Sequence, residues 1–150
     1  MLGKLKKLVL GADPYTATAA NSAERQQLAL AALLVEMTRA DFDATDAEHA
    51  AVQQLLARHF ELNSAEAADL LERATTAMDE AVSLFDFTRA LHEALEPEQK
   101  LEVIRLLWTV AHADDRLDKY EDFLVRKVAD LLYVPTADVL RIKHEVSGAG

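Results

Sequence analysis

A short pattern of residues occurs twice in this chain, and the two copies are separated by a constant offset of 73 residues. Each copy combines a leucine pair on an apolar helical stretch, an Ala-Asp pair, a glutamate and a valine. The first copy comprises Leu33-Leu34, Ala40-Asp41, Glu48 and Val52, and the second comprises Leu106-Leu107, Ala113-Asp114, Glu121 and Val125. Internal repetition of this kind predicts a duplicated helix–loop–helix unit. Its two acidic loops, residues 41–48 and 114–121, are here called the first elbow and the second elbow.

The composition favours a single all-α domain. Of the 150 residues, 51% are hydrophobic, which is enough to form a core, and only four are glycine and three proline, which leaves little room for β-hairpins. No stretch has the period of a β-strand, and no apolar run approaches the ~18 residues of a membrane-spanning helix. The absence of cysteine excludes disulfides and thiolate metal sites and fits a cytoplasmic protein.

Apolar periodicity and capping residues predict a compact bundle of about seven helices with two pseudo-repeated helix–loop–helix halves. A short helix is expected from Phe87 to Leu95. The other helices are predicted to begin at Asn21 or Ser22, at a Thr45–Glu48 capping box, at Asn63 or Ser64, at Pro97, at an Asp118–Glu121 capping box, and at Pro135 or Thr136. The domain is predicted to span residues 21–147. A basic amphipathic segment and loop at 1–20 would precede it, and a disordered tail at 148–150 would follow.

Helical spacing also predicts which side chains face the core. The helix after Pro97 is expected to bury Leu101, Ile104, Leu107, Trp108 and Ala111. The last two helices are expected to bury Phe123, Leu124, Val128, Leu131 and Leu132, and then Val139, Leu140 and Ile142. Trp108 is expected in the core rather than on a binding surface, because it lies on the apolar stripe of its helix.

Each elbow begins with an aspartate where a helix is predicted to end, which is the negative end of the helix dipole. A carboxylate there is unfavourable by roughly 0.3–1 kcal/mol, so its occurrence in both copies predicts a compensating partner. The partner is either the backbone N–H groups of the turn and the next helix, or a divalent cation such as Ca²⁺, Mg²⁺ or Mn²⁺. The candidate metal ligands are Asp41, Asp43 and Glu48 in the first elbow and Asp114, Asp115, Asp118 and Glu121 in the second.

Other motifs give little support to catalysis or to a regular metal site. Neither elbow is an EF-hand, because Asp46 and Lys119 occupy the position that requires glycine. The five histidines form neither an H-x-x-x-H nor a Glu-x-x-His pair, and His112 is expected to cap the C-terminus of its helix. No phosphate-binding loop, nucleophile elbow or triad spacing occurs.

The charge distribution bears on the partners of the protein. A formal net charge of −10 disfavours sequence-independent binding to nucleic acid and is compatible with cations or a basic protein partner. Lys4, Lys6 and Lys7 form the polar face of an amphipathic segment at residues 1–10. Because each lysine would contribute only ~1 kcal/mol at an anionic membrane, we expect peripheral membrane contact at most.

The doubled pattern resembles the tellurite-resistance TerB family and its wider set of TerB-like proteins. The resemblance rests on Ala40-Asp41 with Glu48 and on Ala113-Asp114 with Glu121, and it spans residues 28–146. The resemblance implies an all-helical fold of about seven helices with two similar halves. It also implies a part in stress responses to tellurite and related oxyanions, at the cytoplasmic face of the membrane, with metal sensing and scaffolding of other proteins.

The chain departs from the family pattern in both elbows. The family sequence reads Ala-Asp-Gly, and here the glycine is replaced by Phe42 and by Asp115. A positive φ after the aspartate would be costly at Phe42 and better tolerated at Asp115. The second elbow is therefore the better candidate for an acidic site.

These observations predict a non-enzymatic cytoplasmic module that senses a metal ion or scaffolds a protein partner. The alternative is a purely structural or peptide-binding helical domain without a metal site. An enzyme that uses paired carboxylates is disfavoured, since nothing in the sequence separates their pKa values.

Overall fold

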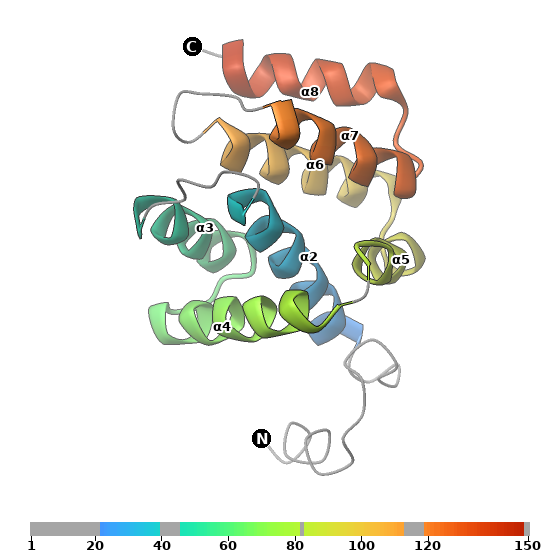
Figure 1. Cartoon of the computed structure of the whole chain (residues 1–150). Helices are drawn as coiled ribbons and strands as arrows, with labels where there is room; N and C mark the ends of the chain where they lie inside the picture. Colours follow the sequence, from blue (N-terminus) through green and yellow to red (C-terminus); the bar gives the residue numbers. More distant parts are fainter. Residues whose placement is uncertain (1–21, 40–45, 82, 113–118, 149–150) are drawn as a thin grey trace.

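The computed structural model describes residues 22–39, 46–81, 83–112 and 119–148, and every regular element in these ranges is an α-helix. The seven helices carry the labels of Figure 1: α2 (Ser22–Arg39), α3 (Asp46–His59), α4 (Ser64–Glu80), α5 (Phe85–Ala94), α6 (Pro97–Ala111), α7 (Lys119–Leu131) and α8 (Thr136–Gly148). The prediction of an all-α bundle of about seven helices is confirmed. None of these seven helices is long and apolar enough to cross a membrane. The basic segment at 1–20 lies outside the described residues.

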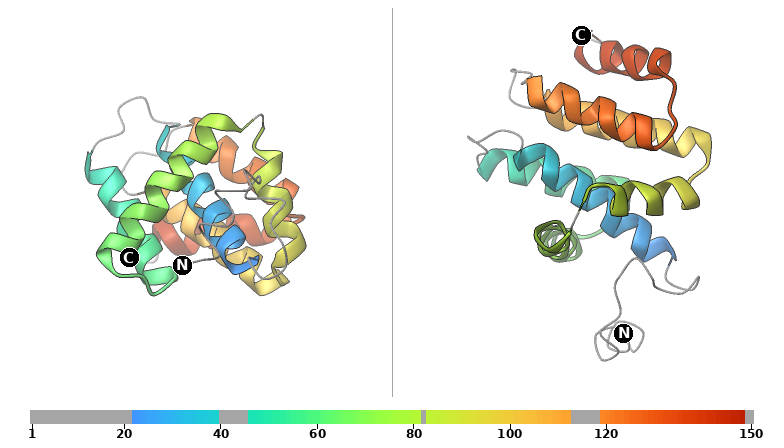
Figure 2. Two further views of the ribbon diagram at one scale, coloured as in Figure 1. Left: turned by 90° about the horizontal axis from the view of Figure 1, so that it is seen from below. Right: turned by 45° about the vertical axis from the view of Figure 1, so that its right-hand side comes forward.

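The helices form two similar three-helix units joined by α5. α2 packs against α3 and α4, and α6 packs in the same way against α7 and α8. In Figure 1 the α6–α8 unit lies above the α2–α4 unit, and Figure 2 shows the same stacking from a second side. α3 begins at Asp46 and α7 at Lys119, so the offset of the sequence repeat also separates the two helix starts.

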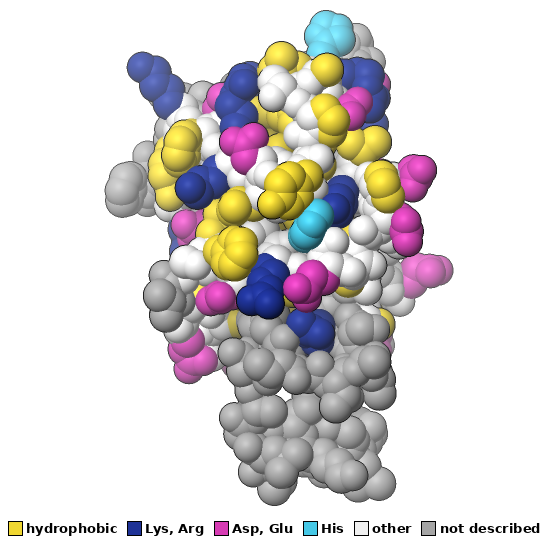
Figure 3. Space-filling model, turned by 90° about the vertical axis from the view of Figure 1, so that its right-hand side faces the viewer, with side chains coloured by type: hydrophobic (Ala, Val, Ile, Leu, Met, Phe, Trp, Pro, Cys, Tyr) yellow, Lys and Arg dark blue, Asp and Glu magenta, His cyan; other side chains and the backbone are white. Residues whose placement is uncertain are grey.

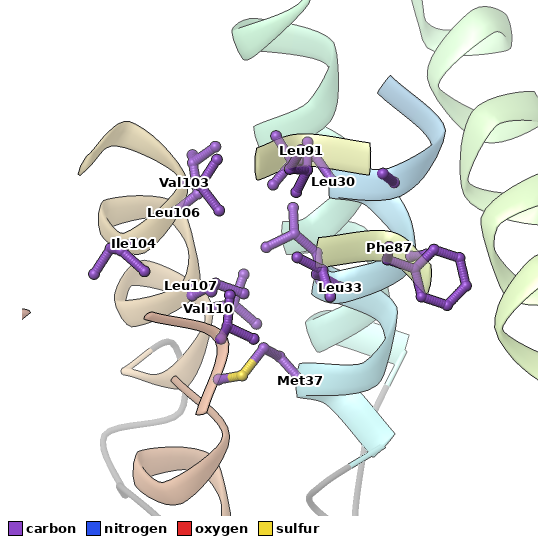
Figure 4. Close-up of a cluster of buried hydrophobic side chains, with 14 of the residues drawn as sticks. Leu30, Leu33, Met37, Phe87, Leu91, Val103, Ile104, Leu106, Leu107 and Val110 are labelled. Atoms are coloured by element: carbon purple, nitrogen blue, oxygen red, sulfur yellow. The ribbon is translucent and has the colours of Figure 1, made fainter. Parts of the chain in front are cut away.

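The core is built around α2, which is buried without interruption over residues 28–35. A helix that is apolar on all sides belongs at the centre of a bundle, and α2 packs against α3, α4, α5 and α6. Figure 4 shows Leu33 and Met37 of α2 near Leu107 and Val110 of α6. All six leucine and valine positions of the repeat are buried: Leu33, Leu34, Val52, Leu106, Leu107 and Val125.

Two helix starts follow the capping signals in the sequence. Asn63 accepts a hydrogen bond from the Glu66 backbone N–H (2.8 Å), and the Glu66 carboxylate accepts one from the Asn63 backbone N–H (2.9 Å). This reciprocal pair satisfies two N–H groups that the first turn of α4 would otherwise leave unpaired. Pro97 occupies the first turn of α6, where its missing N–H costs nothing.

The helices that follow the two elbows end in the same way. Glu61 and Tyr133 have positive φ angles of 54° and 61°. After each of them, a backbone N–H reaches back to the last turn of the helix: from Leu62 to the Ala57 carbonyl (2.8 Å) and from Val134 to the Ala129 carbonyl (2.9 Å). This is the Schellman C-cap, normally made with glycine. The duplicated unit therefore continues beyond α3 and α7 into the turns that lead to α4 and α8.

Two of the predicted core positions are wrong. Phe123 is 57% exposed and Leu140 is 44% exposed. The buried stripe of α7 runs through Glu121, Leu124, Val125, Val128, Ala129 and Leu132, and position 123 falls beside this stripe. α8 contacts α6 and α7 through Val139 and Ile142, which leaves Leu140 on the outer side. Trp108 is fully buried as predicted, and α8 continues through Gly148, one residue past the predicted end of the domain.

The positive φ at Glu61 yields a stability prediction. A side chain in this conformation costs roughly 1 kcal/mol, whereas glycine adopts it without steric penalty. We expect Glu61→Gly to unfold with a free energy about 1 kcal/mol higher than Glu61→Ala, which removes the same charge but keeps the Cβ. Urea denaturation of both variants measures the difference, and equal stabilities would contradict this reading of the turn.

Candidate functional site

The structure describes the helices that flank the elbows. In Figure 1 the C-terminal ends of α2 and α6 and the N-terminal ends of α3 and α7 all lie toward the left side of the molecule. The predicted metal ligands Asp41, Asp43, Asp114, Asp115 and Asp118 lie outside the described residues.

The two remaining predicted ligands occupy equivalent positions in their helices. Glu48 is the third residue of α3 and Glu121 is the third residue of α7. This is the position at which a capping-box glutamate stands. The repeat therefore places one glutamate at the last residue of each elbow, in the first turn of the helix that begins there.

Glu121 is buried, with 4% of its surface exposed. It is the only charged residue among the buried side chains of the described part of the chain, beside Thr38 and Thr88. A buried carboxylate is costly unless other groups compensate its charge. The N-terminal end of α7 contributes to this compensation, because the helix dipole is positive there. Glu121 is thus a first-turn carboxylate directed toward the protein interior.

His112 closes the helix on the other side of the second elbow. Its backbone N–H donates to the Trp108 carbonyl (3.0 Å), and its Nδ1 lies 2.8 Å from the same oxygen. Because a carbonyl oxygen can only accept, Nδ1 carries the proton in this contact. The prediction that His112 caps the C-terminus of its helix is confirmed.

Trp108 connects this helix end to α8. Its indole N–H donates to the Val139 carbonyl at 3.1 Å, and the ring is fully buried. The Lys143 ammonium lies 5.1 Å from the ring centroid, within the range of a cation–π contact. The end of α6 is therefore fixed to α8 by a hydrogen bond from a buried side chain.

A second group of contacts holds the first turn of α7 to α8. Asp122 accepts hydrogen bonds from Lys143 Nζ (2.8 Å) and from Arg126 Nε (2.7 Å). Burial alone would raise the pKa of the Asp122 carboxyl, but the hydrogen bonds and charges of Lys143 and Arg126 outweigh it and hold the pKa below its ordinary value. Sequence analysis missed this cluster. The four-residue spacing of Asp122 and Arg126 predicts their ion pair on one helix, whereas the pairing of Asp122 with Lys143 depends on how α8 packs against α7.

The flank of the first elbow is built differently. Arg39 stands at the position equivalent to His112 and forms an ion pair with Asp79 of α4 instead of capping its helix through a ring nitrogen. Burial raises the pKa of Glu36, one turn earlier, and the nearby Arg39 charge offsets part of this rise. The helix ends that precede the two elbows are therefore equivalent in the repeat and differ in their contacts.

A small hollow of about 170 Å³ lies between α3 and α6. It is lined by side chains of α3 and α6: Ala51, Gln54, Leu55, Arg58, Thr109 and Val110. Cofactor pockets usually exceed ~300 Å³, so this hollow fits a single side chain of a bound peptide better than a cofactor.

The described residues contain no group of three or more histidine, aspartate or glutamate side chains that could hold a metal ion. The predicted ligand sets both include residues outside the described ranges. The cation site at the second elbow therefore stays a prediction, with Glu121 as its described member.

The comparison with known proteins agrees with the resemblance inferred from the doubled pattern. Residues 27–144 match a protein-family model described as "Tellurite resistance protein TerB". The matched range contains both elbows and most of the seven helices. The chain has no significant match among curated proteins or among solved structures.

The Asp122 cluster predicts how stability changes in acid. A carboxyl whose pKa is lower in the folded than in the unfolded chain stabilises the fold above about pH 3.9 and loses this contribution as the pH falls through the folded pKa. The unfolding free energy of the wild type should therefore fall more steeply between about pH 5 and 2 than that of Asp122→Asn. Urea denaturation followed by circular dichroism at each pH measures both slopes.

Glu102→Gln is the matched control for this comparison. Glu102 is exposed on α6 and forms no ion pair within the described ranges. It should keep the wild-type slope, and the Asp122 cluster would lose its assigned role if both variants changed the slope equally.

Proposed function

Because the chain belongs to the tellurite resistance protein TerB family, we propose that it is a non-enzymatic interaction module of the cytoplasm. In this proposal the second elbow binds a divalent cation, and the bound state of the elbow controls contact with a protein partner. The proposed setting is a stress response of the tellurite-resistance type.

The observation that carries the proposal is the burial of Glu121 at the start of α7. Its carboxylate follows a loop that contains Asp114, Asp115 and Asp118. Carboxylate oxygens are the preferred ligands of Ca²⁺, Mg²⁺ and Mn²⁺, and several of them close together repel one another until a cation neutralises them. A buried first-turn carboxylate preceded in the sequence by three aspartates within seven residues therefore supports a ligand set for a hard cation.

The first turn of α7 also connects the second elbow to side chains on the protein surface. Glu121 points inward, Asp122 bonds to Lys143 of α8, and the Tyr120 and Phe123 rings stack on the outer side with centroids 6.3 Å apart. A shift of this turn on cation binding would move the inner carboxylate and the outer aromatic pair together. Control of a partner by the cation would follow from this rigid connection.

Calorimetry with Ca²⁺, Mg²⁺, Mn²⁺ and Zn²⁺ tests the cation site. We expect at least one cation to bind with measurable heat and to raise the unfolding free energy, by about 2.7 kcal/mol at a free concentration 100 times the dissociation constant. Asp114→Asn should lose both effects. Asp41→Asn, which makes the same change in the first elbow, should keep them.

If no cation gives heat and none changes the melting temperature of the wild type, the cation site does not exist. Equal losses in Asp114→Asn and Asp41→Asn would contradict the assignment to the second elbow.

A second candidate function is peptide binding without any metal. It is supported by the hollow between α3 and α6, and by the position of both glutamates, which suits caps that only fix the elbow angle. In that case Asp114→Asn in metal-free buffer should lower the unfolding free energy by roughly 0.5–2 kcal/mol, as the loss of a helix cap does. Thermal denaturation in the presence of a chelator measures this, and unchanged stability would count against the structural role.

A further inference from the structure

The outer side of α7 carries side chains that no helix in the described part of the chain covers. α7 packs against α5, α6 and α8. On its remaining side Phe123 is 57% exposed, and Leu131, two turns later, is partly exposed. Lys127 and Asp130 lie on the same side, and the four residues are here called the α7 face. Figure 3 shows hydrophobic side chains mixed with charged ones on the side of the molecule where α5 and the C-terminal end of α7 lie.

The α7 face is hollowed. Phe123, Arg126, Lys127, Asp130 and Leu131 line a depression of about 200 Å³. This volume is below the ~300 Å³ of typical small-molecule sites but can accept one large side chain. The exposed Phe123 ring therefore forms one wall of a hollow that can accept a side chain of a partner.

The two charged side chains of the α7 face form no ion pair with the residues that the structure describes. Lys127 and Asp130 form no ion pair with any described residue, although Arg126 on the next position is bonded to Asp122. Among the described residues, the face thus carries one cation and one anion without an ion pair, three residues apart. Opposite charges on a single surface are complementary to a second copy of that surface.

We infer that the α7 face binds the same face of a second copy of this chain, with the two α7 helices antiparallel across a twofold axis near Lys127. Phe123 and Leu131 each lie four residues from Lys127, about 6 Å along the helix axis. The axis therefore sets Phe123 of each copy against Leu131 of the other, inside the hollow. The Lys127 ammonium then needs to reach only about 4.5 Å along the axis to meet the partner's Asp130.

The charge balance of the α7 face suits contact between two copies. Each chain carries a formal charge of −10, so two copies repel one another at long range. The α7 face with its neighbours Asp122 and Arg126 carries equal numbers of positive and negative groups. Contact there brings no excess negative charge together, and the two ion pairs that symmetry adds offset the approach of the two Lys127 ammonium groups at the axis.

The contact is small, so the dimer should be weak. Stable interfaces bury at least about 1,200 Å², and one helix face supplies less than this. We expect monomer and dimer to exchange rapidly, with a dissociation constant in the micromolar to millimolar range, about 10⁻⁵–10⁻³ M. The association does not require the cation proposed for the second elbow.

Sedimentation equilibrium of the full chain at about 0.15 M ionic strength, where the long-range repulsion between the two copies is screened, tests the proposal. The wild type should show a reversible monomer–dimer equilibrium, and Phe123→Asp should weaken it at least tenfold, because it places charge in the apolar contact. Leu140→Asp is the matched control. It introduces the same charge at a residue of similar exposure on α8, and it should leave the dimer intact.

A charge exchange identifies the partner as a second α7 face. Lys127→Asp alone should weaken the dimer, because a carboxylate then faces the partner's Asp130 at each of the two symmetric pairs. Adding Asp130→Lys in the same chain restores opposite charges across the axis and should return the dissociation constant to within about twofold of the wild type. Circular dichroism checks that each variant is folded.

The inference fails if the wild type sediments as a monomer up to about 1 mM, the upper end of the expected range. It also fails if the double variant binds no better than Lys127→Asp alone. Cation binding by Phe123→Asp, measured by calorimetry, separates failure of the dimer from failure of the elbow site.

Discussion

The apolar contact between α2 and α6 holds the two halves of the molecule together. Leu33 and Met37 of α2 meet Leu107 and Val110 of α6 across this contact (Figure 4). α3 and α4 pack against α2, and α7 and α8 pack against α6. Removal of the apolar surface of these side chains from water is the main favourable term in folding a bundle of this size. Since both helices end at an elbow, the α2–α6 contact also fixes where the elbow flanks lie. The sites proposed here therefore depend on packing that lies well inside the protein.

Duplication preserved the apolar frame and allowed the polar flanks to diverge. The leucines and valines of the pattern are buried in both halves, because a core position tolerates little change in volume. The helix ends tolerate substitution better than the core positions do. Arg39 makes an ion pair to α4, whereas His112 at the equivalent position bonds to the Trp108 carbonyl. Together with Phe42 in the first elbow, these differences make the second elbow the better candidate for a specific function within the TerB family.

α7 has a buried inner side and an exposed outer side, and both carry large apolar residues as well as charged ones. Its inner side carries a buried carboxylate, Glu121, among aliphatic residues, and its neighbour Asp122 is bonded to α8. Its outer side exposes Phe123 and leaves Lys127 and Asp130 without ion pairs to described residues. The assignment of Phe123 to the core failed for this reason. Periodicity finds a helix with apolar residues, but it cannot tell an inner stripe from an outer contact surface when both contain large side chains.

The sequence by itself determined the fold class, the family, the positions of most helices and the duplicated hairpin. These depend on local physics: apolar spacing, capping pairs such as Asn63 and Glu66, and proline at a helix start. Only the tertiary structure decided which stripe of α7 and α8 is covered, that Glu121 is buried, and that Lys143 reaches Asp122 from 21 residues away. The physical reason is that burial and long-range pairing depend on the crossing of helices, and crossing geometry arises from the whole set of side chains rather than from any local segment.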